Sequence, residues 1–388
     1  MNDSTGIVNI SCIPNLENFK KKLRKRMMKQ QAFFNRREKG DILVYTNYRN
    51  RGIPYLQYYF YNLLLTNNLR DLCDYKIIKE IVLNYVMQVR SCYFGFYNVN
   101  DDALPSYTEP HFHIGSVTAA MTNKNVIFNG QTVACYPQLS WHEIENLKID
   151  KNNPWILFMK GVHRALWELW DEDYLIGGGW YHSPLDAAWA IRGSDIFEEM
   201  ITEPDKVEKL IDWCADSIVE MEKIITEDSK IVNGFRGVLS TLVPDNAILI
   251  NGDPIDLISK DFGKKFEIPY VNKVFRELGA GFYHHHSKGL HQVPIVSQIK
   301  NMHLHNIVND YPNTPDLAET LINNKDIREE VIEASFISPI MIDGAHHNQL
   351  EKLIPILQEG RFVIDFICDS LEDANDCIKK IENINSLK

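Results

Sequence analysis

The chain has 388 residues, of which 45% are hydrophobic and 24% charged, and its formal net charge is −11 at pH 7. A chain of this size has material for a large core, built either as one elaborated barrel or as two domains. The acidic balance excludes a general nucleic-acid binder, because contacts to phosphates need a basic surface.

The seven cysteines are scattered and contain no CxxC pair. This pattern excludes a zinc knuckle made of thiolates alone and indicates a reducing compartment. No apolar run reaches membrane length, and residues 1–14 lack the basic-then-apolar order of a signal peptide. We therefore expect a cytoplasmic protein that does not bind membranes.

The first segment with a clear pattern is Phe19–Phe34, where lysines and arginines crowd one helical length. Leu23, Met27 and Phe34 recur near helical spacing, which predicts an amphipathic helix. A basic helix lying on an acidic body is commoner than one that binds nucleic acid or a membrane, so we interpret this helix as structural. We expect residues 1–40 to be a helical extension and residues 41–388 to form the main domain.

The segment that follows mixes several local patterns. Ile42–Tyr45 predicts a buried strand, Asp71–Val89 a helix, and Val126–Tyr136 a hairpin. Between the last two, His111 and His113 can lie on one side of an extended loop. They are candidate substrate-binding residues, and a stray surface pair is the alternative.

From Asn153 onward, helical periods alternate with short apolar strands as far as the C-terminus. Repeated units of this kind predict a parallel sheet. The chain has many such units and no GxGxxG or Walker-type phosphate loop. We therefore expect an α/β fold, a single closed (β/α)8 TIM barrel with an N-terminal helical and hairpin elaboration.

Three consecutive histidines end one predicted strand, Gly281–His286. Side chains on a strand alternate between faces, so His284 and His286 should share one face while Tyr283 and His285 share the other. A satisfied polar plug is one interpretation of such a run. In barrels of this kind the chemistry lies at the carboxyl ends of the strands, which favours a functional role instead.

Other predicted strands also end in ionisable groups, at Asp253, at Asp310 and at Asp343 with His346 and His347. Carboxylates near imidazoles suit either a divalent metal or general acid–base chemistry. Helix N-caps are an equal alternative for Asp310 and Asp343. Asp253 precedes Pro254 well ahead of the next helix, so capping explains it less readily.

These motifs, in this order, resemble the uroporphyrinogen decarboxylase superfamily. The residues that carry the resemblance are Ser183-Pro184-Leu185-Asp186, Arg192-Gly193, Thr202-Glu203-Pro204, Asn251-Gly252-Asp253-Pro254, Ile268-Pro269-Tyr270, the histidine strand and Ser287-x-Gly289. The resemblance covers roughly Asn153 to the C-terminus. It implies a single (β/α)8 barrel, a homodimer, and either porphyrinogen decarboxylation or methyl transfer to a corrinoid protein.

The chain departs from both branches of that superfamily. The arginine-rich signature that binds the eight carboxylates of a porphyrinogen is not reproduced at Arg36-Arg37 or Arg49–Arg51. In the methyltransferase branch, aligning His286-Ser287-Lys288-Gly289 on the His-x-Cys-Gly zinc motif puts Lys288 in the cysteine position. A charged lysine does not replace a thiolate ligand.

The resemblance to related demethylating enzymes nevertheless implies a metal site without the thiolate. We expect zinc or another divalent metal to be held by His284, His286, Asp253 and Glu267, and Lys288 and His346 to join His111 and His113 in binding a small-molecule substrate. The function favoured is metal-assisted transfer of a methyl group from that substrate to a corrinoid on a partner protein.

Two alternatives stay open. In a carboxy-lyase acting on a porphyrinogen-like or other carboxylate substrate, Asp253, His286 and Tyr283 would be the catalytic residues. The third possibility is a barrel that binds a partner without catalysis, although so many costly polar groups at the strand ends count against it.

Overall fold

The computed structural model describes residues 16–47, 56–107, 114–128, 132–228 and 234–386. The strands are β1 (Ile42–Asn47), β2 (Ser106–Tyr107), β3 (Ile127–Phe128), β4 (Val133–Ala134), β5 (Leu175–Ile176), β6 (Trp180–His182), β7 (Phe235–Val238), β8 (Thr241–Pro244), β9 (Ile248–Asn251), β10 (Gly281–His286), β11 (Met302–Val308), β12 (Ile340–His346) and β13 (Phe362–Ile367). The α-helices are α1 (Leu16–Asn35), α2 (Tyr61–Thr66), α3 (Leu69–Leu72), α4 (Tyr75–Asn98), α5 (Ile114–Thr122), α6 (Trp141–Ile144), α7 (Pro154–Glu168), α8 (Pro184–Arg192), α9 (Ile196–Thr202), α10 (Pro204–Ile225), α11 (Lys260–Phe266), α12 (Ile268–Leu278), α13 (Val293–Val296), α14 (Leu317–Asn323), α15 (Lys325–Ile337), α16 (Leu350–Leu357) and α17 (Leu371–Ser386).

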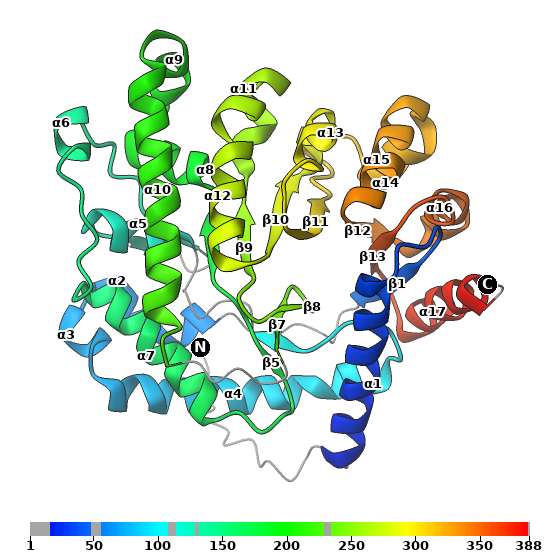
Figure 1. The fold of residues 1–388 in the computed structure, drawn as a ribbon. Helices are drawn as coiled ribbons and strands as arrows, with labels where there is room; N and C mark the ends of the chain where they lie inside the picture. Colours follow the sequence, from blue (N-terminus) through cyan, green and yellow to red (C-terminus); the bar gives the residue numbers. More distant parts are fainter. Residues whose placement is uncertain (1–15, 48–55, 108–113, 129–131, 229–233, 387–388) are drawn as a thin grey trace.

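A seven-stranded parallel sheet forms the centre of the molecule, with helices around it (Figure 1). Its strand order is β1-β13-β12-β11-β10-β9-β6, and every neighbouring pair is parallel. The strands are short apolar runs such as Phe362-Val363-Ile364, whose side chains are all fully buried. Strands covered on both faces by crossover helices need such runs, so the alternation seen in the sequence produces this sheet.

The expected closed barrel is confirmed only in part. The fold is α/β with a parallel central sheet, but β1 and β6 do not pair with each other among the described residues. Short segments lie beside these edges instead: the Asp102 amide donates to the Val44 carbonyl, and β2 pairs with β5 just ahead of β6. Strands this short offer few ladder bonds, so hydrogen-bonded closure is incomplete.

The predicted N-terminal helix is present as α1 and is bonded to the rest of the fold. Buried Gln30 donates from Nε2 to the carbonyls of Asp102 and Ser240, and its Oε1 accepts from the Leu242 amide. The predicted hairpin is also present, as the antiparallel pair β3 and β4. A second hairpin, β7 and β8, occupies the apolar stretch ahead of β9.

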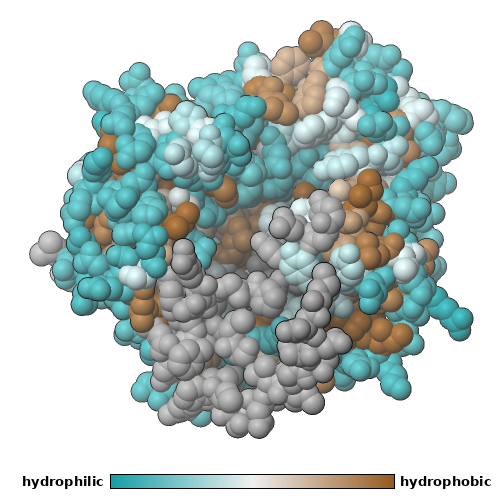
Figure 2. All heavy atoms as spheres, turned by 180° about the vertical axis from the view of Figure 1, so that it is seen from behind, coloured by the Kyte–Doolittle hydropathy of each residue, from teal (hydrophilic) through white to brown (hydrophobic). Residues whose placement is uncertain are grey.

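Hydrophilic side chains cover most of the face seen in Figure 2, which is hollowed near its middle. No helix in the described part of the chain combines the length and the apolar character needed to cross a membrane.

Candidate active site

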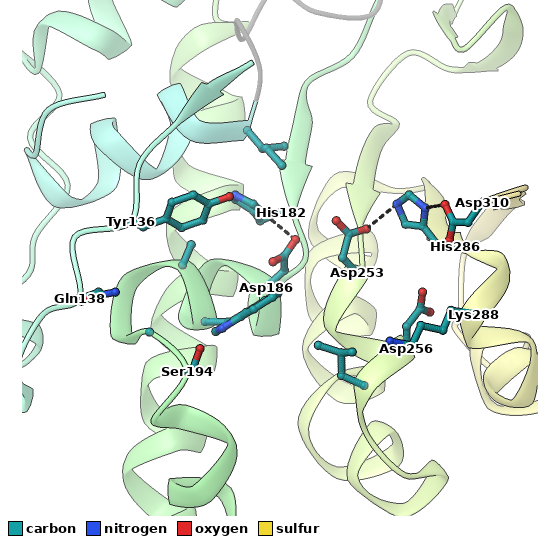
Figure 3. Close-up of a pocket in the computed structure, with 15 residues that line it drawn as sticks. Tyr136, Gln138, His182, Asp186, Ser194, Asp253, Asp256, His286, Lys288 and Asp310 are labelled. Carbon is teal, nitrogen blue, oxygen red and sulfur yellow. Dashed lines mark hydrogen bonds and ion pairs between the residues drawn. The ribbon is translucent and has the colours of Figure 1, made fainter. Parts of the chain in front are cut away.

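A cavity of about 560 Å³ lies where β6, β9, β10 and β11 end. Fifteen described residues line it: Ile114, Tyr136, Gln138, His182, Asp186, Trp189, Ala190, Gly193, Ser194, Asp253, Asp256, Leu257, His286, Lys288 and Asp310. Figure 3 shows two groups of polar side chains facing each other across the cavity, one around Asp253 and His286 and the other around His182 and Asp186. We call these the metal-type wall and the dyad wall.

On the metal-type wall, His286 lies between two carboxylates. Its Nδ1 is 2.6 Å from Asp310 Oδ1, and its Nε2 is 3.3 Å from Asp253 Oδ1. Asp310 follows β11, whose Val308 pairs with His286, and Asp253 lies just beyond β9 on the other side of β10. Parallel register thus brings three strand ends to one point.

His284 points to the same place, as alternation along β10 predicts. One ligand atom from each of Asp253, His284 and His286 lies within 4.8 Å of the other two. The Nδ1 of buried His284 is 2.5 Å from Asn306 Oδ1 on β11. An amide oxygen only accepts, so Nδ1 of His284 carries the proton and its Nε2 keeps a lone pair.

These three residues fit a divalent metal. Each histidine bonds a side-chain oxygen through Nδ1, which is how metal-binding imidazoles are oriented in proteins. Asp253 Oδ1 is shielded from solvent, and its 3.3 Å ion pair with His286 Nε2 lacks hydrogen-bond geometry within the described part of the chain. A buried carboxylate oxygen with so weak a partner is costly, and a cation placed between it and the two imidazoles would remove that cost.

The electrostatics of this wall follow from the same contacts. Burial alone would raise the pKa of Asp253, but His286 outweighs burial and lowers that pKa to about 2. Contact with Asp253 in turn raises the pKa of His286 to about 9 in spite of burial. Burial lowers the pKa of His284 to about 4, so this imidazole stays neutral and able to bind a metal at neutral pH.

On the dyad wall, the last residue of β6 contacts the first turn of α8. His182 Nδ1 is 2.5 Å from Asp186 Oδ2, and both side chains are buried. The Ser183 hydroxyl caps α8 by accepting from the Asp186 amide, so the turn that holds the carboxylate is fixed. Burial favours neutral His182, but the charge of Asp186 outweighs burial and raises the pKa of His182.

This His182–Asp186 dyad was not predicted as part of the site. The signal in the sequence was a histidine at a strand end with an aspartate four residues later, next to the Pro184 that starts a helix. Ser183-Pro184-Leu185-Asp186 contributed only to the resemblance to a known superfamily, and not to the predicted site. Pairing of β6 with β9, which sets His182 opposite Asn251, is what brings the dyad to the same cavity as Asp253.

Glu267, expected as a metal ligand, lies outside that three-residue group. It is fully buried at the junction of α11 and α12, where it accepts from the Tyr283 hydroxyl at 2.6 Å and from the Ser183 hydroxyl at 3.0 Å. Tyr283, expected as catalytic, is likewise fully buried, points to the opposite face of β10 and does not line the cavity. A Cβ at Gly252 would lie 2.0 Å from the Tyr283 hydroxyl, so only glycine fits there. Burial raises the pKa of Glu267 to about 7.

The residues expected to bind substrate do not all lie at this cavity. Lys288 lines the cavity, whereas His346 does not. His346 lies in another group with His347 and Asp369, at the ends of β12 and β13. A bulge at Gly344, where φ is +85°, shifts the register between β12 and β13 just before His346. His111 and His113 lie outside the described residues.

Chemically, the cavity offers a place for a divalent cation on one wall and a proton donor or acceptor on the other. Hydrogen bonds to the histidine Nδ1 atoms hold both walls in place. Asn306 and Asp310 bond the histidines of the metal-type wall, and Asp186 bonds His182. Side chains held from behind in this way keep one reactive geometry, which catalytic sites need.

Comparison with known proteins adds little. No protein-family model matches the sequence, and no curated protein matches it either. Among solved structures, the β-methylaspartase of Clostridium tetanomorphum, determined as a Mg complex, is similar over 79% of this chain and 67% of its own, at 10% identity and a TM-score of 0.31. A likeness at that level defines neither the fold nor the activity of this chain.

Proposed function

We propose that this protein is an enzyme that holds a divalent metal, zinc or a similar ion, with Asp253, His284 and His286. We further propose that it transfers a methyl group from a small substrate to a corrinoid on a partner protein. The observation that carries the proposal is that two imidazoles fixed through Nδ1 converge with a buried oxygen of Asp253, whose 3.3 Å ion pair with His286 lacks hydrogen-bond geometry.

A metal bound there would act as a Lewis acid on the substrate heteroatom. The chain's own residues then supply orientation and protons. His182 has its Nδ1 held by Asp186, and no hydrogen bond engages its Nε2 within the described part of the chain. His182 therefore suits proton delivery to the leaving oxygen or nitrogen as the carbon–heteroatom bond breaks and the methyl carbon bonds to cobalt.

The charge of the cavity supports a small neutral or cationic methyl donor. Four aspartates line it, Asp186, Asp253, Asp256 and Asp310, against one lysine, Lys288. A porphyrinogen with eight carboxylates would meet like charges on both walls, which disfavours its binding. Trp189 and Tyr136 add aromatic surface on which a methylated ammonium group can lie.

The test is methyl transfer to free cob(I)alamin, followed by its absorption change, with a panel of methanol, methylamines and methoxyarenes. We expect one class of donor to react, the rate to vanish after chelation, and added Zn²⁺ or Co²⁺ to restore it. His286→Ala should be inactive, whereas His142→Ala, an exposed histidine on α6 away from the cavity, should be unchanged. Chelator-resistant activity, or no reaction with any donor, would contradict the proposal.

A second candidate is decarboxylation by acid–base chemistry. The observation in its favour is that His286 contacts both Asp253 and Asp310 directly, so its cation is stabilised as a proton donor. Under this alternative, release of CO2 from a carboxylated substrate would persist after chelation and would be lost in Asp253→Asn.

A further inference from the structure

Asp256 lines the strand-end cavity but has no part in the chemistry described above. It lies in the 3-10 helix η3 (Asp253–Leu257), three residues after Asp253. Side chains three residues apart in a 3-10 helix lie above one another on one face, about 6 Å apart along the helix axis. Both carboxylates therefore belong to the same side of the cavity, as Figure 3 shows.

The Asp256 carboxylate is enclosed without receiving a hydrogen bond. Its side chain is 7% exposed, and its Oδ1 is shielded from solvent. His285 Nδ1 lies 3.4 Å from that oxygen, but the contact lacks hydrogen-bond geometry. The proton on His285 Nδ1 is directed to the His286 carbonyl, 2.9 Å away, because a carbonyl oxygen only accepts. A carboxylate buried in this way, with no donor among the described residues, is costly.

The packing around Asp256 holds its carboxylate at the cavity. A Cβ at Gly289 would lie 1.8 Å from Asp256 Oδ1, so a larger residue there would displace the carboxylate. With Oδ1 against Gly289 and His285, the carboxylate turns its other edge toward the cavity that Asp256 lines. Lys288, the lysine of that lining, is exposed and forms no ion pair with Asp256 within the described ranges. A fixed anion is thus left for a cation that a ligand brings.

An ammonium group suits this place better than a second metal ion. Among the described residues, Asp256 belongs to neither group of histidines and carboxylates that could hold a metal. What Asp256 lacks is a hydrogen-bond donor, and the N–H groups of a protonated amine supply one together with a positive charge. A quaternary ammonium group supplies the charge alone.

We propose that Asp256 selects the substrate by binding a protonated amine, so that the methyl donor carries an ammonium group at one end and a methylated heteroatom at the other. The inference rests on the proposed function, since it places the methylated end at Asp253, His284 and His286. The spacing of about 6 Å along η3 corresponds to a few bonds between the two ends of the donor. A cavity of about 560 Å³ has room for such a molecule.

The test compares two probes of similar shape, 3-methoxypropylamine and 3-methoxypropan-1-ol, titrated calorimetrically into the full-length protein at neutral pH and low ionic strength. The amine carries an ammonium group where the alcohol carries a neutral hydroxyl. We expect the amine to bind at least about tenfold more tightly, and less so as salt is added, because a hydrogen bond between charged groups is stronger and is screened by ions. In Asp256→Asn the two affinities should differ by less than about twofold.

The matched control is Asp261→Asn, which lowers the negative charge of the protein by the same amount. The Asp261 side chain is 95% exposed on α11 and lies outside the cavity, so this variant should keep the wild-type preference for the amine. Equal binding of the two probes to the wild type, or an undiminished preference in Asp256→Asn, would overturn the inference. The wild-type comparison decides the matter even where Asp256→Asn does not fold.

The titration needs no turnover, so it separates this inference from the proposed function. A preference for the amine that depends on Asp256, without methyl transfer to cob(I)alamin from any donor, would support the ammonium site and contradict the proposed function alone. Methyl transfer from neutral donors with the same kcat/KM as from amines would overturn the inference and leave the proposed function standing.

Discussion

Two groups among the described residues contain two histidines and one aspartate close enough to share an ion, yet they differ in what lies behind the imidazoles. In Asp253, His284 and His286, each histidine is held through Nδ1 by a side-chain oxygen. In the group at the ends of β12 and β13, His346 Nδ1 accepts the Asn348 amide, so its Nε2 carries the proton. In this tautomer His346 Nε2 offers a cation no lone pair. His286 Nε2 also carries a proton at neutral pH, but it faces the buried oxygen of Asp253, where a divalent cation can take the place of that proton.

The second group is also satisfied without a cation. His347 Nε2 is 3.2 Å from Asp369 Oδ2, its Nδ1 is 3.6 Å from Asp373 Oδ1, and the Asp369 side chain is 73% exposed. By contrast, Asp253 Oδ1 is buried, and its 3.3 Å contact with His286 Nε2 lacks hydrogen-bond geometry among the described residues. The same three residue types thus make a metal-type site in one place and a partly exposed ion-pair cluster in the other. Supporting hydrogen bonds make the difference.

The largest effect is expected from His286→Ala. Removing this imidazole leaves two ligands, and the affinity for Zn²⁺ should fall by more than about a hundredfold, beyond what loss of a supporting residue causes. Calorimetric titration of the chelator-treated protein checks this. Unchanged affinity would show that the ion binds elsewhere, and His142→Ala controls for loss of a surface histidine.

A smaller loss is expected from Asp310→Asn. The amide can turn its oxygen to His286 Nδ1 but no longer supplies a negative charge, so Zn²⁺ affinity should fall by roughly 10- to 100-fold while the stoichiometry stays at one. If Asp310 only caps the chain after β11, the variant would bind Zn²⁺ like the wild type. Ser287, whose hydroxyl accepts from the Asp310 amide, offers the matched control Ser287→Ala.

The pH dependence of the free energy of unfolding tests whether the buried Glu267 side chain is protonated in the folded protein. Its pKa is raised from 4.5 to about 7 in the folded protein, so folding favours the protonated form. The folded state binds more protons than the unfolded chain between these values. The free energy of unfolding should therefore fall by about 3 kcal/mol as pH rises from 4.5 to 7, and should be unaffected by this group outside that window.

In Glu267→Gln this component of the pH dependence should be absent, because the amide does not titrate. Urea unfolding of both proteins across this pH range measures the difference. A wild-type stability that rises through the window to the same extent as that of the variant would show that Glu267 is ionised throughout.

The smallest effect is expected from His346→Ala. Zn²⁺ stoichiometry should remain one, and the affinity should change by less than about twofold, because the Nε2 of His346 is protonated and the cluster needs no ion. A fall from two bound ions to one would show that the groups are equivalent and would break the comparison.

Local patterns predicted much of this architecture. Period-two alternation alone puts His284 and His286 on one face of β10, and the alternation of helices with apolar strands predicts the parallel sheet. Asp253 was found because neighbouring parallel strands end at one edge. These features depend on the spacing of residues within a strand or on adjacent strands, and a sequence carries both.

What was missed depends on longer-range geometry. His182 and Asp186 join the cavity only because β6 pairs with β9, two elements separated by the whole of α8, α9 and α10. Glu267 is buried because the chain breaks between α11 and α12 at that residue. His346 is displaced by a bulge at Gly344 and by β11, which lies between β12 and β10. Register, breaks and bulges of this kind leave weak traces in one sequence.

The central claim is that Asp253, His284 and His286 hold one divalent metal ion. The most direct measurement is the metal content of the protein purified without a histidine tag, compared with that of His284→Ala and of His346→Ala. We predict close to one transition-metal ion per chain in the wild type and in His346→Ala, and almost none in His284→Ala. A wild-type protein without stoichiometric metal that also fails to take up Zn²⁺ in a titration would contradict the claim, as would equal metal content in all three proteins.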